Sequence, residues 1–170
     1  MIKFTSYEVV ICLVSINSTP ATANTLSRRD VEMVSSLGKQ ARRIEEDIQN
    51  YKAGRALAPK DTEYIMQSTC WDQLFRVTEA VTIALSHNAM TVGLSSQMIN
   101  SDDEAHALMA AKADTEGAIA IMASARKVVG YVLGACSSDT LLVAESQQMT
   151  SFLDQADTVI SSLTRRLPSF

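Results

Sequence analysis

The stretch VSSLGKQARRIEEDIQNY, residues 34–51, decides the fold class of this 170-residue chain. Its apolar residues recur at alternating spacings of three and four, and they are Val34, Leu37, Ala41, Ile44, Ile48 and Tyr51. Such spacing places them on one face of an α-helix, as in the seam of a coiled coil. The remaining faces are crowded with charged residues. We expect an amphipathic helix over about residues 26–57, with Ser27 and Asp30 as its capping box.

The same period recurs in three further segments, over about residues 61–100, 101–136 and 137–167. In the second segment, Asn88 and Ser95 interrupt the apolar stripe. The other members of that stripe are Cys70, Trp71, Leu74, Val77, Val81, Leu85, Val92 and Ile99. The third stripe consists of Leu108, Thr115, Ile119, Met122, Val129 and Leu133. The fourth consists of Met149, Phe152, Ala156, Ile160, Leu163 and Leu167.

Residues suited to helix starts separate these segments. Ser101 and Glu104 have the spacing of a second capping box, and Asp139 is one of three consecutive N-cap residues before the last segment. Short connections between long helices favour antiparallel neighbours. We therefore predict an all-α fold, an up-down-up-down four-helix bundle. A three-helix bundle with a hooked N-terminal helix is the alternative.

The N-terminus has the order of a secretory signal peptide. Lys3 precedes the apolar run Val9–Ile16, and small residues of A-x-A type follow at 21–23. We expect residues 1–23 to be cleaved and residues 24–170 to form a single domain in the periplasm or outside the cell. A buried first helix is the alternative reading of the apolar run. This run is too short to cross a bilayer, so the mature chain is not expected to insert stably into a membrane.

Cleavage would leave two of the three cysteines, Cys70 and Cys136, and a pair in an oxidising compartment is expected to form a disulfide. If the second and third helices turn around near residues 100–102, Cys70 lies opposite residue 132. Cys136 is then about 6 Å further along the helix axis, at the limit for a bridge. The alternative is two buried free thiols. Trp71, beside Cys70, is expected to pack in the core.

Composition and motifs exclude several classes of function. A net charge of −4 argues against nucleic-acid binding. The sequence contains no Cys-x-x-Cys pair, no glycine-rich phosphate loop and no Gly-x-Ser-x-Gly elbow. The Glu-x-x-His motif of di-iron bundles is absent as well. We therefore expect a protein that is not an enzyme and has no cofactor.

Polar residues within or beside the apolar stripes are the candidates for a small-ligand site. They are Asn88, Ser95, Thr115, Arg126 and Glu145. Arg126 and Glu145 could form a buried ion pair, although such residues more often lie at the edge of a stripe. A metal site is a further hypothesis at the end where the second and third helices meet, because thioether and imidazole ligands suit copper and carboxylates suit harder ions. Its candidate ligands are Met98, Asp102, Asp103, His106 and Met109.

Four strong helical stripes without a catalytic constellation favour an exported, non-enzymatic interaction or accessory module. Apolar surface left over on the helices, especially on the first two, would bind a protein partner helix or a second copy of the chain. The alternative is a bundle that binds a small ligand or a metal.

Overall fold

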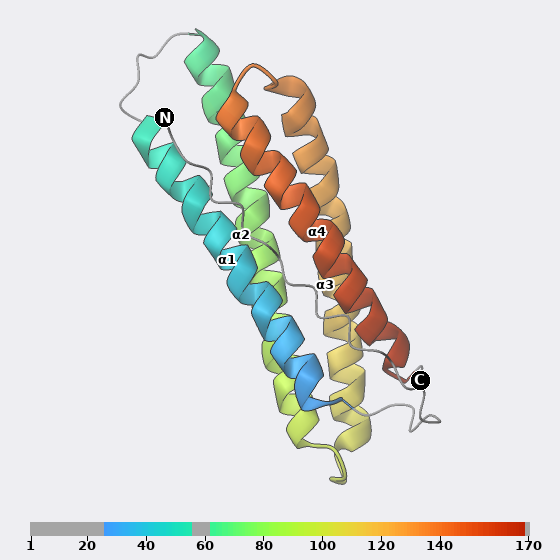
Figure 1. The fold of residues 1–170 in the computed structure, drawn as a ribbon. Helices are drawn as coiled ribbons and strands as arrows, with labels where there is room; N and C mark the ends of the chain where they lie inside the picture. The colour runs from blue at the N-terminus through green and yellow to red at the C-terminus, as the bar shows by residue number, and fades with distance from the viewer. Residues whose placement is uncertain (1–25, 56–61, 169–170) are drawn as a thin grey trace, which may run out of the picture.

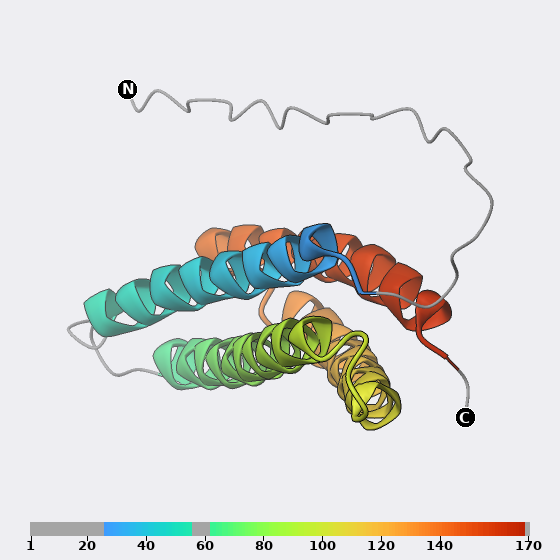
Figure 2. The same ribbon diagram turned by 90° about the horizontal axis from the view of Figure 1, so that it is seen from below.

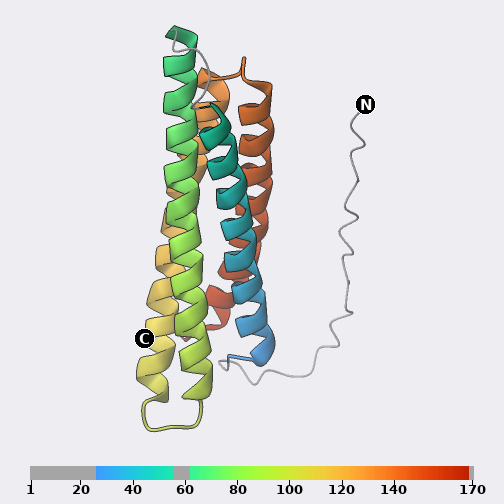
Figure 3. The same ribbon diagram turned by 90° about the vertical axis from the view of Figure 1, so that its left-hand side faces the viewer.

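Four long helices account for nearly all of the part of the chain that the computed structural model describes, residues 26–55 and 62–168 (Figure 1). The helices are α1 (Arg28–Arg55), α2 (Thr62–Gln97), α3 (Glu104–Ala135) and α4 (Thr140–Arg166). Successive helices run in opposite directions, as Figures 1 and 3 show. The predicted all-α, up-down-up-down bundle is confirmed, and the three-helix alternative is wrong because residues 28–55 form a full-length helix of the bundle.

The view from below shows α1 and α4 on one side of the bundle and α2 and α3 on the other (Figure 2). The most extensive packing joins α1 to α2, followed by α2 to α3 and α3 to α4, whereas α1 and α4 touch over a smaller area. Neighbours in sequence are therefore the main neighbours in space, as short connections between helices favour.

A strict alternation of four- and three-residue steps explains which side of α2 is buried. Nine of its buried positions follow this alternation, namely Gln67, Trp71, Leu74, Thr78, Val81, Leu85, Asn88, Val92 and Ser95, and Cys70 and Thr82 are buried beside them. This is the a/d pattern of a coiled coil, so Asn88 and Ser95 belong to the stripe that they were expected to interrupt. Tyr51, in contrast, is 38% exposed at the far end of α1, although its ring lies 6.0 Å from that of Trp71.

The two predicted capping boxes have different outcomes. The box of α1 is formed, because Ser27 N donates to Asp30 Oδ2 at 2.8 Å and Asp30 N donates to Ser27 Oγ at 3.3 Å. Before α3, Ser101 Oγ instead donates to the carbonyl of Met98, and Asp103 is the N-cap. Glu104 accepts from the backbone N–H of Asn100, whose φ of 67° turns the chain between the helices.

Cys70 and Cys136 form the expected disulfide, with their Cα atoms 6.6 Å apart. The register between α2 and α3 explains how the offset is absorbed. In a regular antiparallel helix pair, the residue numbers of facing positions have a constant sum. This sum is 202 for the hydrogen-bonded Ser95 and Ala107 but 206 for the two cysteines, so the register shifts by four residues between these two levels. Cys136 lies just past the end of α3, at its C-cap, where the chain has left the helix.

Trp71 closes the same end of the bundle and is only 1% exposed. Its Nε1 donates to Asp139 Oδ2 at 3.0 Å, and Asp139 Oδ1 accepts from the backbone N–H of Leu142 at 3.1 Å. Asp139 is the N-cap of α4, as the sequence predicts. The indole therefore joins α2 to the first turn of α4, a polar role that the expected core packing did not include.

Candidate interaction surface on the outer face of α2 and α3

Four of the five polar residues predicted to line a ligand site link one helix to another, and Glu145 does not. Asn88 Nδ2 donates to Thr115 Oγ1 at 3.1 Å, which joins α2 to α3 in the core. Ser95 Oγ donates to the carbonyl of Ala107 at 2.7 Å between the same helices. Asn88 Oδ1 has no hydrogen-bond partner. These residues do not line the groove described below.

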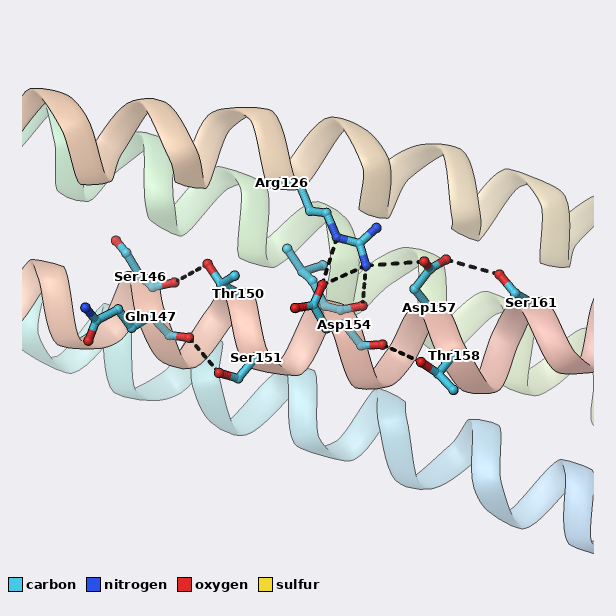
Figure 4. A network of polar contacts seen from close by, with 10 residues as sticks. Arg126, Ser146, Gln147, Thr150, Ser151, Asp154, Asp157, Thr158 and Ser161 are labelled. Atoms are coloured by element: carbon cyan, nitrogen blue, oxygen red, sulfur yellow. Dashed lines mark hydrogen bonds and ion pairs between the residues drawn. The ribbon is translucent and has the colours of Figure 1, made fainter.

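Arg126 lies at the edge of the α3 stripe and binds α4 (Figure 4). Its Nη2 donates to the carbonyl of Leu153 at 3.0 Å, to Asp154 at 3.1 Å and to Asp157 at 3.3 Å. The ion pair with Glu145 that the sequence allowed is therefore not formed. Its Nε also donates to Asp154, at 3.2 Å. The hydroxyls of Thr150, Ser151 and Thr158 in Figure 4 donate to α4's own backbone, and that of Ser161 donates to Asp157.

Glu145 is a buried acid that forms no ion pair with the residues that the structure describes. It is 7% exposed, and its Oε2 has no hydrogen-bond partner. Burial, with a smaller contribution from the carboxylate of Asp47, raises the pKa of Glu145 above its ordinary value. The next residue, Ser146, also has a buried hydroxyl that lacks a partner.

The fold provides no observation in favour of the predicted metal site. Across residues 26–55 and 62–168, histidine, cysteine, aspartate and glutamate side chains are nowhere grouped by three as metal ligands would be. Asp102, Asp103 and His106 are all exposed at the α2–α3 turn, and Glu104 is engaged by the backbone of Asn100.

A second stripe of apolar residues runs along the side of α2 that faces away from the core. Ile83, Met90 and Leu94 are 64%, 56% and 56% exposed. They share one face with His87, because the steps between these four positions are four, three and four residues. Exposed single apolar residues are ordinary, but a row at helical spacing is typical of a docking surface.

The neighbouring side of α3 continues this surface with small and apolar residues. Met109, Ala113, Gly117 and Ile121 follow at steps of four residues, and all are exposed. We call these four residues, together with Ile83, His87, Met90 and Leu94 of α2, the outer seam. Because Ala113 and Gly117 have almost no side chain, another helix could approach α3 closely there.

A groove of about 440 Å³ lies between the two halves of the outer seam. Its walls are apolar apart from His87 and Asp114, whose Nδ1 and Oδ2 atoms are 3.1 Å apart. A Cβ atom added at Gly117 would meet nothing within 4 Å, so the groove is open to solvent at this point. The lining residues are Ala80, Ile83, Ala84, His87, Ala113, Asp114, Gly117, Ala118 and Ile121.

The composition of α3 reflects this outward apolar face. Among the described residues, α3 is the one helix that is long and apolar enough to cross a membrane, judged by length and composition alone. Only 28% of its most apolar 18-residue stretch is buried in the bundle. A helix with one buried stripe normally carries polar residues elsewhere, but α3 carries alanine and glycine at 110, 113, 117 and 120. Much of its apolar surface therefore remains uncovered.

The groove between α1 and α4 has a different character. It measures about 300 Å³ and is lined by polar side chains together with Ile44 and Phe152. Its polar members are Gln40, Arg43, Gln148, Ser151 and Gln155. Of these two grooves, the one within the outer seam is thus the more apolar. Leftover apolar surface was expected mainly on the first two helices, and the structure places it on α2 and α3.

Comparison of the chain with protein-family models, curated proteins and solved structures gives no match.

Proposed function

We propose that this protein is an exported, non-enzymatic interaction or accessory module that binds a protein partner through the outer seam. The observation that carries the proposal is the row of Ile83, Met90 and Leu94 beside the open α2–α3 groove. Apolar surface of this kind costs free energy in water, and covering it with a partner helix would recover about 25 cal/mol per Å².

The disulfide supports the proposed location in the periplasm or outside the cell. Structural disulfides persist in oxidising compartments and are rare in a reducing cytosol. The predicted signal peptide, residues 1–23, lies outside the described residues. The intact mass of protein from the native host tests both points: we expect the mass of residues 24–170, two hydrogens short. A full-length, reduced chain would contradict the proposed export.

A photocrosslinking residue placed at Ile83 in the native host tests the interaction itself. We expect a discrete covalent adduct after irradiation, because the side chain at this position would be covered by the partner. Ile65 is the matched control, since it is on the same helix and 62% exposed, but lies far from the groove. An equal yield of adducts at both positions, or none at either, would contradict the proposal.

A further inference from the structure

The two halves of the outer seam are centred at the same level of the bundle. The α2 row from Ile83 to Leu94 has its midpoint between residues 88 and 89, and the α3 row from Met109 to Ile121 has its midpoint at 115. Asn88 is hydrogen-bonded to Thr115, so these midpoints lie side by side. Consider a second copy related by a two-fold axis at this level, perpendicular to the helices. Each row would then pack against the same row of the second copy, running in the opposite direction.

Such an axis would bring large apolar side chains together at the ends of both rows and small residues together at the middle of the α3 row. Ile83 would face Leu94 of the second copy, and Met109 would face Ile121. Near the axis, Ala113 would face Gly117, and these two small residues let the helices approach closely there, with the exposed Glu116 beside them. His87 lies near the centre and has Asp114 as its own polar partner, at 3.1 Å.

Exposed charges at the two ends of the outer seam select this orientation. Asp102 and Asp103 lie at one end, and Arg76 and Lys127 lie at the other; all four are exposed and none is ion-paired among the described residues. The perpendicular axis would place Asp103 opposite Lys127 of the second copy, since each is twelve residues from position 115. Asp102 would come within one residue of the level of Arg76. An axis parallel to the helices would instead bring the acidic ends together, which like-charge repulsion opposes.

The surface is large enough for a stable dimer. The outer seam itself is about 18 Å long at 1.5 Å per residue. With the charged residues at its two ends, from Arg76 to the α2–α3 turn, the surface is about 37 Å long, and two helices side by side are about 20 Å wide. Each copy would then bury roughly 700 Å², or about 1,400 Å² in total, within the range of specific interfaces.

We propose that the outer seam binds a second copy of this chain, and that the protein forms an antiparallel, two-fold symmetric dimer through α2 and α3. This inference rests on the proposed function, because it names the partner of the same surface. The partner's α2 lies antiparallel to α2, and the acidic end of each copy pairs with the basic end of the other.

Sedimentation equilibrium of the purified, oxidised protein over micromolar to hundreds-of-micromolar concentrations tests the dimer. We expect a reversible dimer that Ile83→Glu weakens at least tenfold, because a charge would be buried in the interface. Ile65→Glu is the matched control and should leave the dissociation constant unchanged. Circular dichroism and thermal melting of each variant establish that it folds. A monomer at all concentrations, or a dimer that ignores Ile83→Glu, would overturn the proposal.

A charge exchange tests the antiparallel orientation. Lys127→Asp places two acids together at each end of the dimer, so we expect a several-fold weaker dimer at low salt. Adding Asp103→Lys recreates the pair with opposite signs and should restore the affinity. Failure of the double variant to recover, with both variants folded, would exclude this orientation.

Two outcomes separate this inference from the proposed function. If the purified protein is monomeric but Ile83 crosslinks to a different protein in the native host, the seam is an interaction surface and the second copy is excluded. If the monomer binds phosphatidylglycerol-containing vesicles and Ile83→Glu abolishes this binding, the seam contacts a membrane, and both proposals fail.

Discussion

Asp30 joins the two ends of the described chain. It is 2% exposed and accepts hydrogen bonds from Ser27 in α1's own capping box and from both terminal nitrogens of Arg166 at the end of α4. Burial alone would raise the pKa of Asp30, but the hydrogen bonds and charge of Arg166 and the hydrogen bonds of Ser27 outweigh it, and the pKa is lowered. The carboxylate is therefore charged, and it takes part both in the capping box of α1 and in an ion pair with Arg166.

Asp30→Asn should destabilise the protein at pH 7 by about 2 kcal/mol, since it weakens charge-assisted hydrogen bonds in a buried setting. Thermal melting should show a decrease of roughly 4–8 °C. A carboxyl with a lowered folded pKa contributes stability above its unfolded pKa and loses it as the pH falls through the folded value. The difference from wild type should therefore begin to shrink below about pH 4 and continue to shrink as the pH falls through the lowered folded pKa. Glu46→Gln, exposed on the same helix, is the control and should melt like wild type at pH 7.

Glu145 shows the opposite behaviour, because nothing compensates the burial of its charge. Glu145→Leu should raise the stability at pH 7 by about 1 kcal/mol, or roughly 2–4 °C, by removing an unsatisfied acid from the α4 stripe. Since the folded pKa is raised above the usual 4.5, the folded state binds the proton more tightly than the unfolded chain. Wild-type stability relative to Glu145→Leu should decline as the pH rises from 4.5 through the raised pKa. A melting difference that is the same at pH 4 and pH 7 would contradict this account.

At the scale of elements, the disulfide and the Trp71–Asp139 hydrogen bond fasten the end of the bundle where α3 gives way to α4. Both involve α2, which is the helix that contacts all three others. At the opposite end, Asn100 reverses the chain between α2 and α3 with a φ of 67°. The α2–α3 pair is thus closed at both ends, which gives the outer seam a rigid base.

Replacing Cys70 and Cys136 by serine should destabilise the protein by about 4 kcal/mol, because the bridge closes a loop of 66 residues in the unfolded chain. Urea unfolding of this variant, compared with the oxidised wild type, measures the difference. Reduction of the wild type should lower its unfolding midpoint similarly, while it should leave the midpoint of the double variant unchanged. If the reductant shifts both proteins equally, the loss does not come from the bridge.

At the scale of the whole molecule, packing follows chain order, and the smaller contact between α1 and α4 is fastened near their ends by Arg166 and Asp30. The outer seam lies on the α2–α3 side of the bundle, away from this fastening (Figure 2). A dimer through the seam would therefore leave the α1–α4 face free.

The helices and their buried faces were accessible from sequence, because the period of apolar residues depends only on the 3.6-residue turn. All six residues predicted for the α4 stripe are buried, and the predicted helix limits agree with the structure within three residues. Tyr51 and Val77 were predicted to lie in buried stripes, but Tyr51 is exposed and Val77 is only partly buried. The sequence pattern does not reveal how far the neighbouring helix extends over each stripe. Arg126 and Glu145 looked alike in sequence, yet one is neutralised by α4 and the other is left buried.

The sequence by itself determined the secondary structure, the antiparallel topology and the identity of the paired cysteines, because periodicity, caps and short connections act locally. Tertiary structure alone decided the register that brings Cys70 to Cys136, the partners of Asp30, Trp71 and Arg126, and the position of the outer seam. These depend on the relative rotation and axial shift of whole helices. Such quantities are set by the packing of many side chains together, and no short stretch of sequence contains them.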